Sequence, residues 1–382
     1  MLIVKTSSLG DIIHTLPAVT DASRANREVR FDWVVEENFV EIPSWHPAVE
    51  RVIPVAIRRW RRQPLATLRQ GEISEFRKNL QRYHYDLIID AQGLIKSGIL
   101  CRMAKGLTVG MNNHSSREPL ATLFYNRVFS VPRTLHAVDR VRELFSRALN
   151  YSLFEDPYKS NLINAGDVDY GLDLARIGID HSSENEDNRR PSLLFLHGTT
   201  WETKHWPLPY WRALMRLATE KGYQVKMPWG NQQELDRAKA IAKGIEGAIV
   251  LQKQTLAGLA RHMAQAEGVV AVDTGLGHLA AALAVPTISL YGPTNPGLSG
   301  TFGRHQHRLQ STLSCAPCIK KRCHYTGKPI LDQADAQKFA VQPPCFSVHP
   351  PAAVWKALQT LIMEHKTGSI ITSSKFSAKT VG

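Results

Sequence analysis

Residues 2–16 read LIVKTSSLGDIIHTL, in which a short apolar run leads through a polar turn into an amphipathic stretch. The run from Leu2 to Lys5 predicts a buried strand, because short branched apolar runs are typical of parallel sheets. Gly10 permits a tight turn, and Asp11 stands where the next helix is expected to begin. The stretch therefore predicts the first strand–loop–helix unit of an α/β fold.

The same unit repeats along both halves of the chain. In the first half, strands are expected at residues 2–5, 31–35, 51–55, 87–90 and 108–111. In the second half, strands are expected at residues 192–197, 224–228, 248–251, 269–273 and 287–291, with helices beginning near Pro207, Gln232, Thr255 and Gly275. This alternation predicts two Rossmann-like, doubly wound domains that face each other across a cleft, with ligands bound beyond the carboxyl ends of the strands.

Changes in composition set the expected limits of the parts. Residues 1–181 form the first predicted domain, and the polar stretch SSENEDNRR at 182–190 is the predicted linker. The second predicted domain covers 191–310, and a cysteine-containing segment covers 311–350. Residues 366–382 are expected to form a disordered tail.

The overall composition is that of a folded globular protein. Hydrophobic residues make up 43% and charged residues 21% of the 382 residues, which excludes wholesale disorder. Asp273 and His278 interrupt the most apolar region, so no membrane-spanning helix is expected. The first residues lack the pattern of a secretory signal, and five cysteines do not suggest a disulfide framework. We therefore expect the protein in the cytoplasm.

Basic residues are concentrated in one quarter of the chain. The net charge is +13, and residues 58–148 hold 17 Lys and Arg against 7 Asp and Glu. The densest piece is Arg58-Arg59-Trp60-Arg61-Arg62, and clustered arginines suit phosphate and carboxylate groups. Anionic lipid, a phosphorylated small molecule and nucleic acid are the candidate partners, and a solvated helix face is the structural alternative. No nucleic-acid-binding motif accompanies the cluster, so nucleic acid is not expected.

The loop after the first predicted strand offers a carboxylate. Ser7 and Ser8 can each cap the next helix, which leaves Asp11 free to take part in chemistry. The alternative is that Asp11 is itself only a helix cap.

Two loops in the second half suit a diphosphate. Thr199, Thr200 and Lys204 precede a helix that begins at Pro207, and hydroxyls, backbone amides and a lysine are groups that hold phosphates. In the stretch Asp273-Thr274-Gly275-Leu276-Gly277-His278, a strand ends in Asp and glycines open a helix whose N-terminus can hold an anion. The alternative for the first loop is a polar loop with an ordinary surface lysine.

An NAD(P)-dependent oxidoreductase is the rival enzyme class. Residues 275–280 match the G-x-G-x-x-A fingerprint of dinucleotide-binding proteins. That fingerprint requires an acidic residue about 20 positions later, but no Asp or Glu occurs from Thr274 to Leu331. The sequence also lacks a Walker A motif, so a P-loop nucleotidase is not supported.

The motifs in these loops resemble glycosyltransferase family 9, the lipopolysaccharide heptosyltransferases. Residues 4–17, VKTSSLGDIIHTLP, are similar to the family's opening motif, and most of all to that of the members that add the first heptose. Asp273–Leu279 resembles the family's donor-site signature, and Lys204–Pro207 resembles its phosphate loop. The resemblance extends from about residue 1 to residue 310 and implies the two-domain GT-B architecture.

The resemblance implies an inverting transfer of L-glycero-D-manno-heptose from ADP-heptose to the Kdo of Kdo2-lipid A, as the first heptose of the inner core. Addition of the second heptose is the alternative within the family. The acceptor is anionic and lies at the cytoplasmic face of the inner membrane, which implies peripheral contact with an anionic membrane. In this architecture the final helix, expected at 352–365, packs back on the first domain, which binds the acceptor.

Site residues follow from physical reasoning beside the resemblance. Asp11 is expected to be the base that deprotonates the acceptor hydroxyl, and Lys204 to stabilise the leaving ADP. The expected donor-binding residues are Thr199, Thr200, Lys204, Glu234, Gln254, Asp273, Thr274, Gly275 and His278. The expected acceptor-binding residues are Ser8, Gly10, Arg58, Arg61 and Lys96. Glu234 has the alternative of an ordinary helix-start acid, and Gln254 departs from the family, which often has an apolar residue against adenine.

No cofactor and no catalytic metal are expected, because Lys204 and helix amides are available to meet the diphosphate.

The C-terminal segment contains four cysteines, Cys315, Cys318, Cys323 and Cys345, and their pattern allows two interpretations. They form either a structural zinc site with four thiolates or reduced thiols in an ordered loop.

Overall fold

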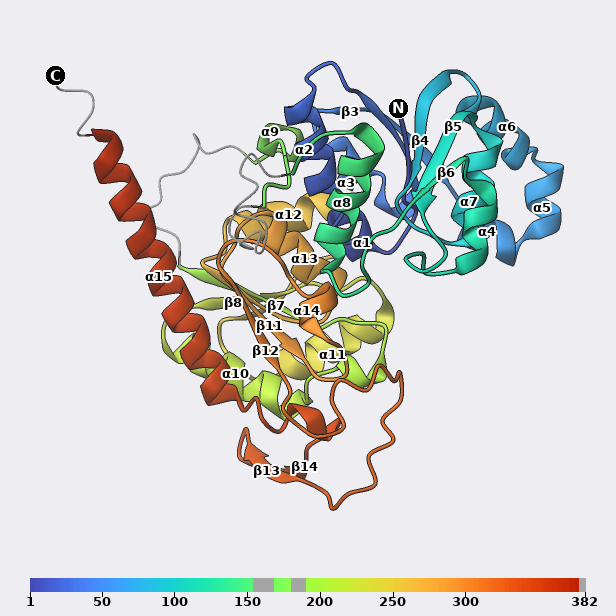
Figure 1. Ribbon diagram of the computed structural model, residues 1–382. Helices are drawn as coiled ribbons and strands as arrows, with labels where there is room; N and C mark the ends of the chain where they lie inside the picture. Colours follow the sequence, from blue (N-terminus) through green and yellow to red (C-terminus); the bar gives the residue numbers. More distant parts are fainter. Residues whose placement is uncertain (154–167, 180–189, 378–382) are drawn as a thin grey trace. The chain divides into compact units, whose positions relative to one another are not determined.

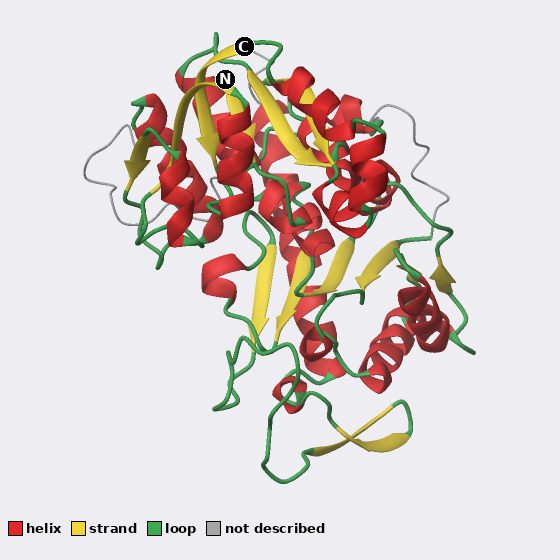
Figure 2. Ribbon diagram, turned by 90° about the vertical axis from the view of Figure 1, so that its right-hand side faces the viewer, coloured by secondary structure: helices red, strands yellow, loops and turns green. Residues whose placement is uncertain are grey.

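The computed structural model describes residues 1–153, 168–179 and 190–377, which form two compact units (Figure 1). The described residues up to Ile177 belong to unit 1, and those from Gly178 belong to unit 2. The predicted linker at 182–190 lies outside the described residues except for Arg190. In both units, helices pack against a sheet (Figure 2).

Unit 1 contains a parallel sheet with the strand order β3-β2-β1-β4-β5-β6. Its strands are β1 (Leu2–Val4), β2 (Phe31–Glu36), β3 (Val49–Val55), β4 (His84–Asp90), β5 (Lys105–Met111) and β6 (Arg127–Phe129). Its helices are α1 (Leu9–Ile13), α2 (Leu16–Ala25), η1 (Glu37–Phe39), α3 (Glu41–Ser44), α4 (Ile57–Arg62), α5 (Pro64–Arg69), α6 (Glu72–Leu80), α7 (Ile95–Met103), η2 (Pro119–Phe124), α8 (Ala137–Leu149) and α9 (Leu174–Ile177). Strands β1 and β2 are buried at every residue, as expected of strands covered on both faces.

Unit 2 contains a parallel sheet with the strand order β12-β11-β10-β7-β8-β9 and a separate antiparallel pair, β13-β14. Its strands are β7 (Ser192–Leu196), β8 (Gln224–Met227), β9 (Ala248–Val250), β10 (Gly268–Val272), β11 (Thr287–Tyr291), β12 (Gln306–Gln310), β13 (Leu331–Ala334) and β14 (Gln337–Ala340). Its helices are η6 (Glu202–Lys204), α10 (Leu208–Glu220), α11 (Gln232–Ala242), α12 (Leu256–Ala264), α13 (Gly275–Ala282), α14 (Pro296–Ser299), η7 (Pro344–Phe346) and α15 (Pro351–Ser377).

Both sheets have the Rossmann strand order. When the strands are counted within each unit, each parallel sheet has the order 3-2-1-4-5-6. The order reverses between β1 and β4 in unit 1, and between β7 and β10 in unit 2. Ligands of such sheets bind outside the carboxyl ends of the two strands at this switch point. The prediction of two Rossmann-like sheets is confirmed.

Helix caps explain why the helix starts in unit 2 were predictable. At the start of α11, Asn231 Oδ1 accepts a hydrogen bond from Glu234 N at 3.0 Å. At the start of α12, Thr255 Oγ1 accepts a hydrogen bond from Gly258 N at 3.0 Å. Both are residue types that favour this position.

Four strands were not predicted, namely β6, β12, β13 and β14. Strand β12 reads QHRLQ and is largely exposed, so its sequence carries no apolar alternation. It is a strand because it pairs in parallel with β11 along its whole length. Pairing with β11 therefore stabilises a strand that the local sequence does not predict.

Helix α15 corrects two predictions. Val354, Leu358 and Ile362 are buried in the core of unit 2, and the helix contacts α10, β10 and β11. The helix predicted at 352–365 therefore belongs to the core of unit 2, whereas it was predicted to pack back on the first domain, because apolar spacing predicts a helix but not the sheet that it covers. The helix also continues to Ser377, where a disordered tail was predicted from 366, since no proline interrupts it. Residues 378–382 lie outside the described part. No described helix is long and apolar enough to cross a membrane.

Leu358→Ala is expected to lower the free energy of unfolding by about 2–5 kcal/mol, because the Leu358 side chain is fully buried between α15 and the sheet. Met363→Ala is the matched control, because the Met363 side chain is 65% exposed on the same helix, and it should change stability by less than about 0.5 kcal/mol. Urea unfolding measures both. Equal effects of the two substitutions would contradict the packing of α15.

Candidate functional site

Polar loops follow four neighbouring strands of unit 2. The loops after β10, β7, β8 and β9 lie at one edge of the sheet, in that spatial order. The residues predicted to bind the donor lie in these loops or in the helices that follow them: Glu234 is in the first turn of α11, Gly275 begins α13, and His278 is buried within α13. The side chain of Trp229 links two of these loops, because its Nε1 donates a hydrogen bond to Leu251 O at 2.7 Å.

An ion pair joins the loops on the two sides of the switch point in unit 2. Lys204 Nζ lies 2.7 Å from Asp273 Oδ2, and the two side chains are only 16% and 10% exposed. Thr294 Oγ1 donates a hydrogen bond to the same carboxylate oxygen at 2.6 Å. Thr199 Oγ1 donates to the backbone carbonyl of Asp273 at 3.2 Å. The ring of Trp201 lies 4.5 Å from Lys204 Nζ, so the ammonium also contacts an aromatic face.

A helix N-terminus adds positive charge at the same sheet edge. Helix α13 begins at Gly275, directly after Asp273 and the N-cap Thr274. The Thr274 side chain makes no capping hydrogen bond. Lys204 and the partial positive charge of α13 therefore favour an anionic group at this edge.

Glu234 lies against the loop after β7. A Cβ atom on Gly198 would fall 2.8 Å from Glu234 Cδ, so the carboxyl group lies close against the backbone of this loop. Glu234 Oε2 accepts a hydrogen bond from Gly230 N at 2.7 Å. Glu234 is thus an acid in the first turn of α11. Its carboxylate also lies beside the pocket next to Thr199, so both interpretations, helix-start acid and donor-binding residue, remain compatible with its position.

Two predicted donor residues stand apart from this group. Gln254 Nε2 donates to Gln252 O at 3.1 Å within the loop after β9, and its Oε1 lies against Gly258 of α12. Thr200 is exposed in the loop after β7.

Sequence analysis did not predict Thr294 and Trp201. Thr294 follows β11, so the rule that polar residues after strands form the site would have found it. No sequence rule would have found Trp201, because its contact with Lys204 depends on where the fold places the lysine side chain.

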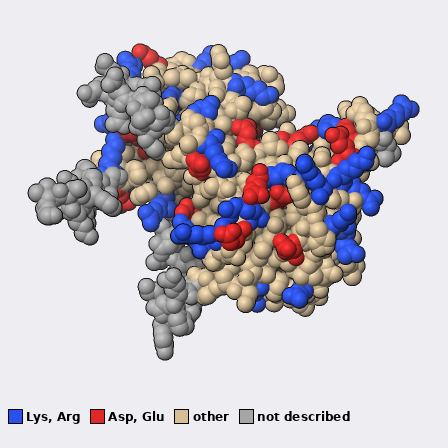
Figure 3. All heavy atoms as spheres, turned by 90° about the horizontal axis from the view of Figure 1, so that it is seen from above, with Lys and Arg blue, Asp and Glu red and all other residues tan. Residues whose placement is uncertain are grey.

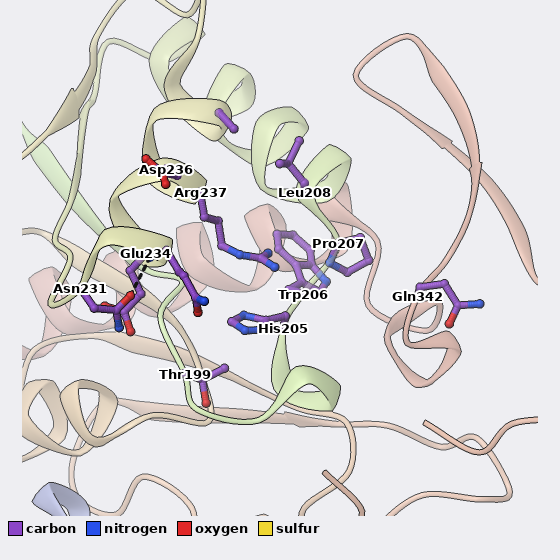
Figure 4. Close-up of a pocket in the computed structure, with 12 residues that line it drawn as sticks. Thr199, His205, Trp206, Pro207, Leu208, Asn231, Glu234, Asp236, Arg237 and Gln342 are labelled. Carbon is purple, nitrogen blue, oxygen red and sulfur yellow. Dashed lines mark hydrogen bonds between the residues drawn. The ribbon is translucent and has the colours of Figure 1, made fainter. Parts of the chain in front are cut away.

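A pocket of about 530 Å³ opens beside Thr199 and Glu234 (Figure 4). Figure 4 shows Arg237 of α11 extending toward His205 and Trp206 on the opposite wall. One wall comes from the loop after β7, which includes the motif residues His205, Trp206 and Pro207, and the other comes from α11, with Gln342 of the C-terminal segment at the edge.

Two histidines next to this pocket are neutral at pH 7. His197 is fully buried at the end of β7, and burial, followed by the charge of Arg237, lowers its pKa to about 4. Burial and Arg237 likewise lower the pKa of His205 to about 4. The rings therefore act as polar, uncharged parts of the wall.

The switch point of unit 1 contains Asp11. Ser8 N and Ser8 Oγ donate hydrogen bonds to Asp11 Oδ2 at 2.8 and 3.0 Å. Ser8 is the N-cap of α1, and the two residues cap the helix reciprocally. The second oxygen, Oδ1, lies 3.9 Å from the Arg117 guanidinium. Asp11 is therefore part of the helix cap and still offers one carboxylate oxygen to another group.

Neighbouring charges keep Asp11 ionised. Burial raises the pKa of its carboxyl group, but Lys5, Arg117 and the bonds from Ser8 outweigh burial, so the pKa lies below its ordinary value. Lys5 Nζ itself donates to Ala91 O at 2.7 Å in the loop after β4. At neutral pH this carboxylate is ready to accept a proton.

The predicted acceptor cations lie mainly at the end of β2. Arg58 N donates to Glu36 Oε1 at 3.2 Å. Burial raises the pKa of Glu36, and the charges of Arg58 and Lys96 oppose that shift, so both cations lie near this carboxyl group. Arg61 is exposed on α4, and Gly10 is buried in α1.

Basic side chains gather at the right-hand end of Figure 3, the end at which α4, α5 and α6 lie in Figure 1. One of the two cations that lower the pKa of Asp11, however, is Arg117, which was not predicted. It lies between β5 and η2, where no motif distinguishes it from the other arginines of the basic quarter.

The four C-terminal cysteines differ in burial. Cys345 is packed into the core of unit 2, Cys318 is half-buried, and Cys315 and Cys323 are exposed. Among the described side chains, no three of His, Cys, Asp or Glu are arranged to hold a metal ion. Burial, and then the three neighbouring cysteines, raise the pKa of the Cys345 thiol to about 12. The four cysteines form no disulfide among the described residues, and both interpretations of the segment stay predictions.

Two Rossmann units, one with a carboxylate at its switch point and the other with a lysine and a helix N-terminus, define a glycosyltransferase of the GT-B architecture. Comparison with known proteins agrees. A family model, glycosyltransferase family 9 (heptosyltransferase), matches residues 73–328. The chain is 50% identical over 371 residues to lipopolysaccharide heptosyltransferase 1 of Pseudomonas aeruginosa, covering 96% of this chain and 99% of that protein. The chain belongs to glycosyltransferase family 9, the heptosyltransferases.

Solved structures of relatives have the same fold. E. coli heptosyltransferase WaaC with ADP superimposes with a TM-score of 0.73 at 47% identity, covering 81% of this chain and 92% of that chain. WaaC with ADP-2-deoxy-2-fluoro heptose gives a TM-score of 0.71 at 46% identity, with the same coverage. The rival oxidoreductase is thereby excluded, and the glycines that suggested it follow the fourth strand of their sheet instead of the first.

Stability is expected to fall as the pH falls from about 6.5 toward 4. The pKa of His197 is about 4 in the folded state, below the ordinary 6.5, so the unfolded chain binds a proton in this range that the folded chain does not. The stabilisation is complete above pH 6.5 and is lost below it. His197→Gln should flatten this pH dependence in urea unfolding, whereas His307→Gln, at an exposed site on β12, should not. An unchanged slope in His197→Gln would contradict the assignment.

Proposed function

We propose that this protein transfers L-glycero-D-manno-heptose from ADP-heptose to the Kdo of Kdo2-lipid A with inversion, as the first heptose of the lipopolysaccharide inner core. The Lys204–Asp273 pair beside the N-terminus of α13 carries the proposal, because it offers a diphosphate a cation at the switch point. The name of the Pseudomonas aeruginosa relative and the ADP and ADP-2-deoxy-2-fluoro heptose bound by WaaC support the same donor.

The donor side uses groups that the fold holds ready. Lys204 exchanges its contact with the Asp273 carboxylate for a contact with the diphosphate, and the first amides of α13 add hydrogen bonds. Asp273 remains held by Thr294 and is then free to accept a sugar hydroxyl. Glu234, fixed by Gly230 N, accepts the ribose hydroxyls. The remaining donor contacts in this proposal come from Thr199, Thr200, Gln254, Thr274, Gly275 and His278.

In the chemical step, the acceptor hydroxyl attacks the anomeric carbon and Asp11 acts as the base. Asp11 accepts the proton of a Kdo hydroxyl while the hydroxyl oxygen forms a bond to the anomeric carbon from the face opposite the phosphate. The bond from that carbon to the phosphate oxygen breaks, and its electron pair leaves with ADP. Lys204 and α13 stabilise the charge that develops on the leaving group.

The acceptor side uses the basic quarter of unit 1. In this proposal Arg58, Arg61 and Lys96 meet the phosphates and carboxylates of the acceptor, and Ser8 and Gly10 shape the loop that holds Asp11. Because the acceptor is a lipid of the inner membrane, the protein works as a peripheral protein on the cytoplasmic face of that membrane.

The proposed reaction is tested by mass spectrometry of the product after incubation with ADP-heptose and Kdo2-lipid A. We expect a gain of one heptose, also in excess EDTA, since Lys204 provides the charge that a metal ion provides elsewhere. Transfer only to an acceptor that already carries one heptose would favour addition of the second heptose. Loss of transfer in EDTA that magnesium restores would contradict the role given to Lys204.

Asp11→Ala is expected to lower turnover by about 10²- to 10⁴-fold without changing ADP affinity, because it removes the base but leaves unit 2 intact. Asp11→Asn is the discriminating variant, because its amide oxygen still accepts the hydrogen bond from Ser8 N but is not basic. It should be as inactive as Asp11→Ala; recovered turnover would make Asp11 a helix cap only. Lys204→Ala, in contrast, should reduce both turnover and ADP affinity.

A further inference from the structure

Two leucines of unit 1 are exposed on a short, well-anchored helix. The side chains of Leu120 and Leu123 in η2 are 60% and 79% exposed. Positions three apart in a 3-10 helix lie on the same face, so the two side chains project together. Ala121, between them, is fully buried and fixes the opposite face of the helix. The exposed leucines therefore belong to an ordered surface.

Helix α7 packs against η2 and carries a third exposed apolar side chain. Glu118, just before η2, accepts a hydrogen bond from Ile95 N at 2.7 Å through Oε2. The ring of Phe124 packs so tightly on Gly98 that a Cβ atom there would lie 2.6 Å from it. Ile99 follows Gly98 and is 47% exposed. Ile99, Leu120 and Leu123 are called the apolar patch below.

The segment that carries the apolar patch is basic. From Ile95 to Arg133 the chain holds six Lys and Arg and a single acid, Glu118, which is engaged with Ile95 N. Lys96 and Arg102 lie one turn before and one turn after Ile99 on α7. Apolar side chains within a basic surface are the combination that binds an anionic lipid interface.

The patch is connected to the proposed base. Arg117, which lies 3.9 Å from Asp11, is separated from the start of η2 by one residue. An enzyme that modifies a sugar attached directly to a lipid must hold its base close to the lipid surface. Three side chains also form a smaller surface than a stable protein–protein interface requires, which favours a membrane over a protein partner.

We propose that the apolar patch inserts into the interface of the membrane that holds the acceptor, while the basic residues around it contact anionic headgroups. The inference rests on the proposed function, since the lipid-linked acceptor is what brings the protein to a membrane. The inference adds to that function the surface of unit 1 that contacts the membrane.

The test uses the full chain and sedimentation with vesicles of phosphatidylethanolamine and phosphatidylglycerol. Leu120→Asp/Leu123→Asp should weaken vesicle binding by at least about tenfold, because it replaces inserted apolar groups with charges that anionic lipid repels. Leu331→Asp is the matched control, because Leu331 is 75% exposed on β13 of unit 2 and should not affect binding. Unchanged binding of the double variant, or an equal loss in Leu331→Asp, would overturn the proposal.

A second readout does not depend on loss of binding. Leu123→Trp should show a blue-shifted emission component on addition of the same vesicles, measured against wild type, whose eight tryptophans give the background. Leu331→Trp should show no such shift. Absence of the shift in Leu123→Trp would overturn insertion even if charge alone held the protein on the vesicles.

The acceptor separates failure of docking from failure of the proposed function. With Kdo2-lipid A in vesicles, Leu120→Asp/Leu123→Asp should lose turnover, whereas with the same saccharide without acyl chains it should equal wild type. Equal turnover of both proteins on vesicles would count against docking through the patch. If wild type transferred heptose to neither acceptor, the proposed function would fail, and vesicle binding would still decide the role of the patch.

Discussion

The ion pair between Lys204 and Asp273 is the interaction on which the donor unit depends. Both charges are largely removed from water, and neither is stable there without a partner. The pair forms because β7 and β10 run parallel and in register as neighbours, so that the loops that follow them must meet. These are the two strands between which the sheet reverses its order, which is where a Rossmann sheet opens a crevice. The pair thus holds a cation in place at the one sheet edge that is built to receive a ligand.

Unit 1 repeats this constraint with the charges arranged differently. Its switch point lies between β1 and β4, and Gln92 Oε1 after β4 accepts hydrogen bonds from Thr6 N and Ser7 N after β1, at 3.1 and 3.3 Å. Here the fold presents the Asp11 carboxylate, and the charge of the buried Lys5 lowers the pKa of that carboxyl group. The same strand order therefore presents a carboxylate in one unit and a cation in the other, and the proposed transfer assigns one chemical role to each.

The residues predictable from sequence are those whose roles are local. Asp11 and Lys204 lie in the short segments that follow the apolar strands β1 and β7, so the strand pattern and the rule for parallel sheets predict that they lie near the switch points. Arg117 was not predictable, because only the folding of a long loop beyond β5 brings it to Asp11. Helix α15 was assigned to the wrong sheet for the same reason: Leu358 shows an apolar face in sequence, but not that Gly268 of β10 leaves the space for it.

The C-terminal segment shows how distant residues set the position of a local motif. The Thr203 hydroxyl, next to Lys204, donates to the backbone carbonyl of Lys320, and Trp206 Nε1 donates to His349 O at 3.2 Å. The phosphate loop is therefore held on both sides of Lys204 by residues more than a hundred positions later. Lys321 also lies over the Trp201 ring, at 5.8 Å, on which Lys204 rests. The motif alone identifies the lysine, but the segment after residue 310 fixes where its ammonium lies, so this segment is best understood as part of the donor unit's framework.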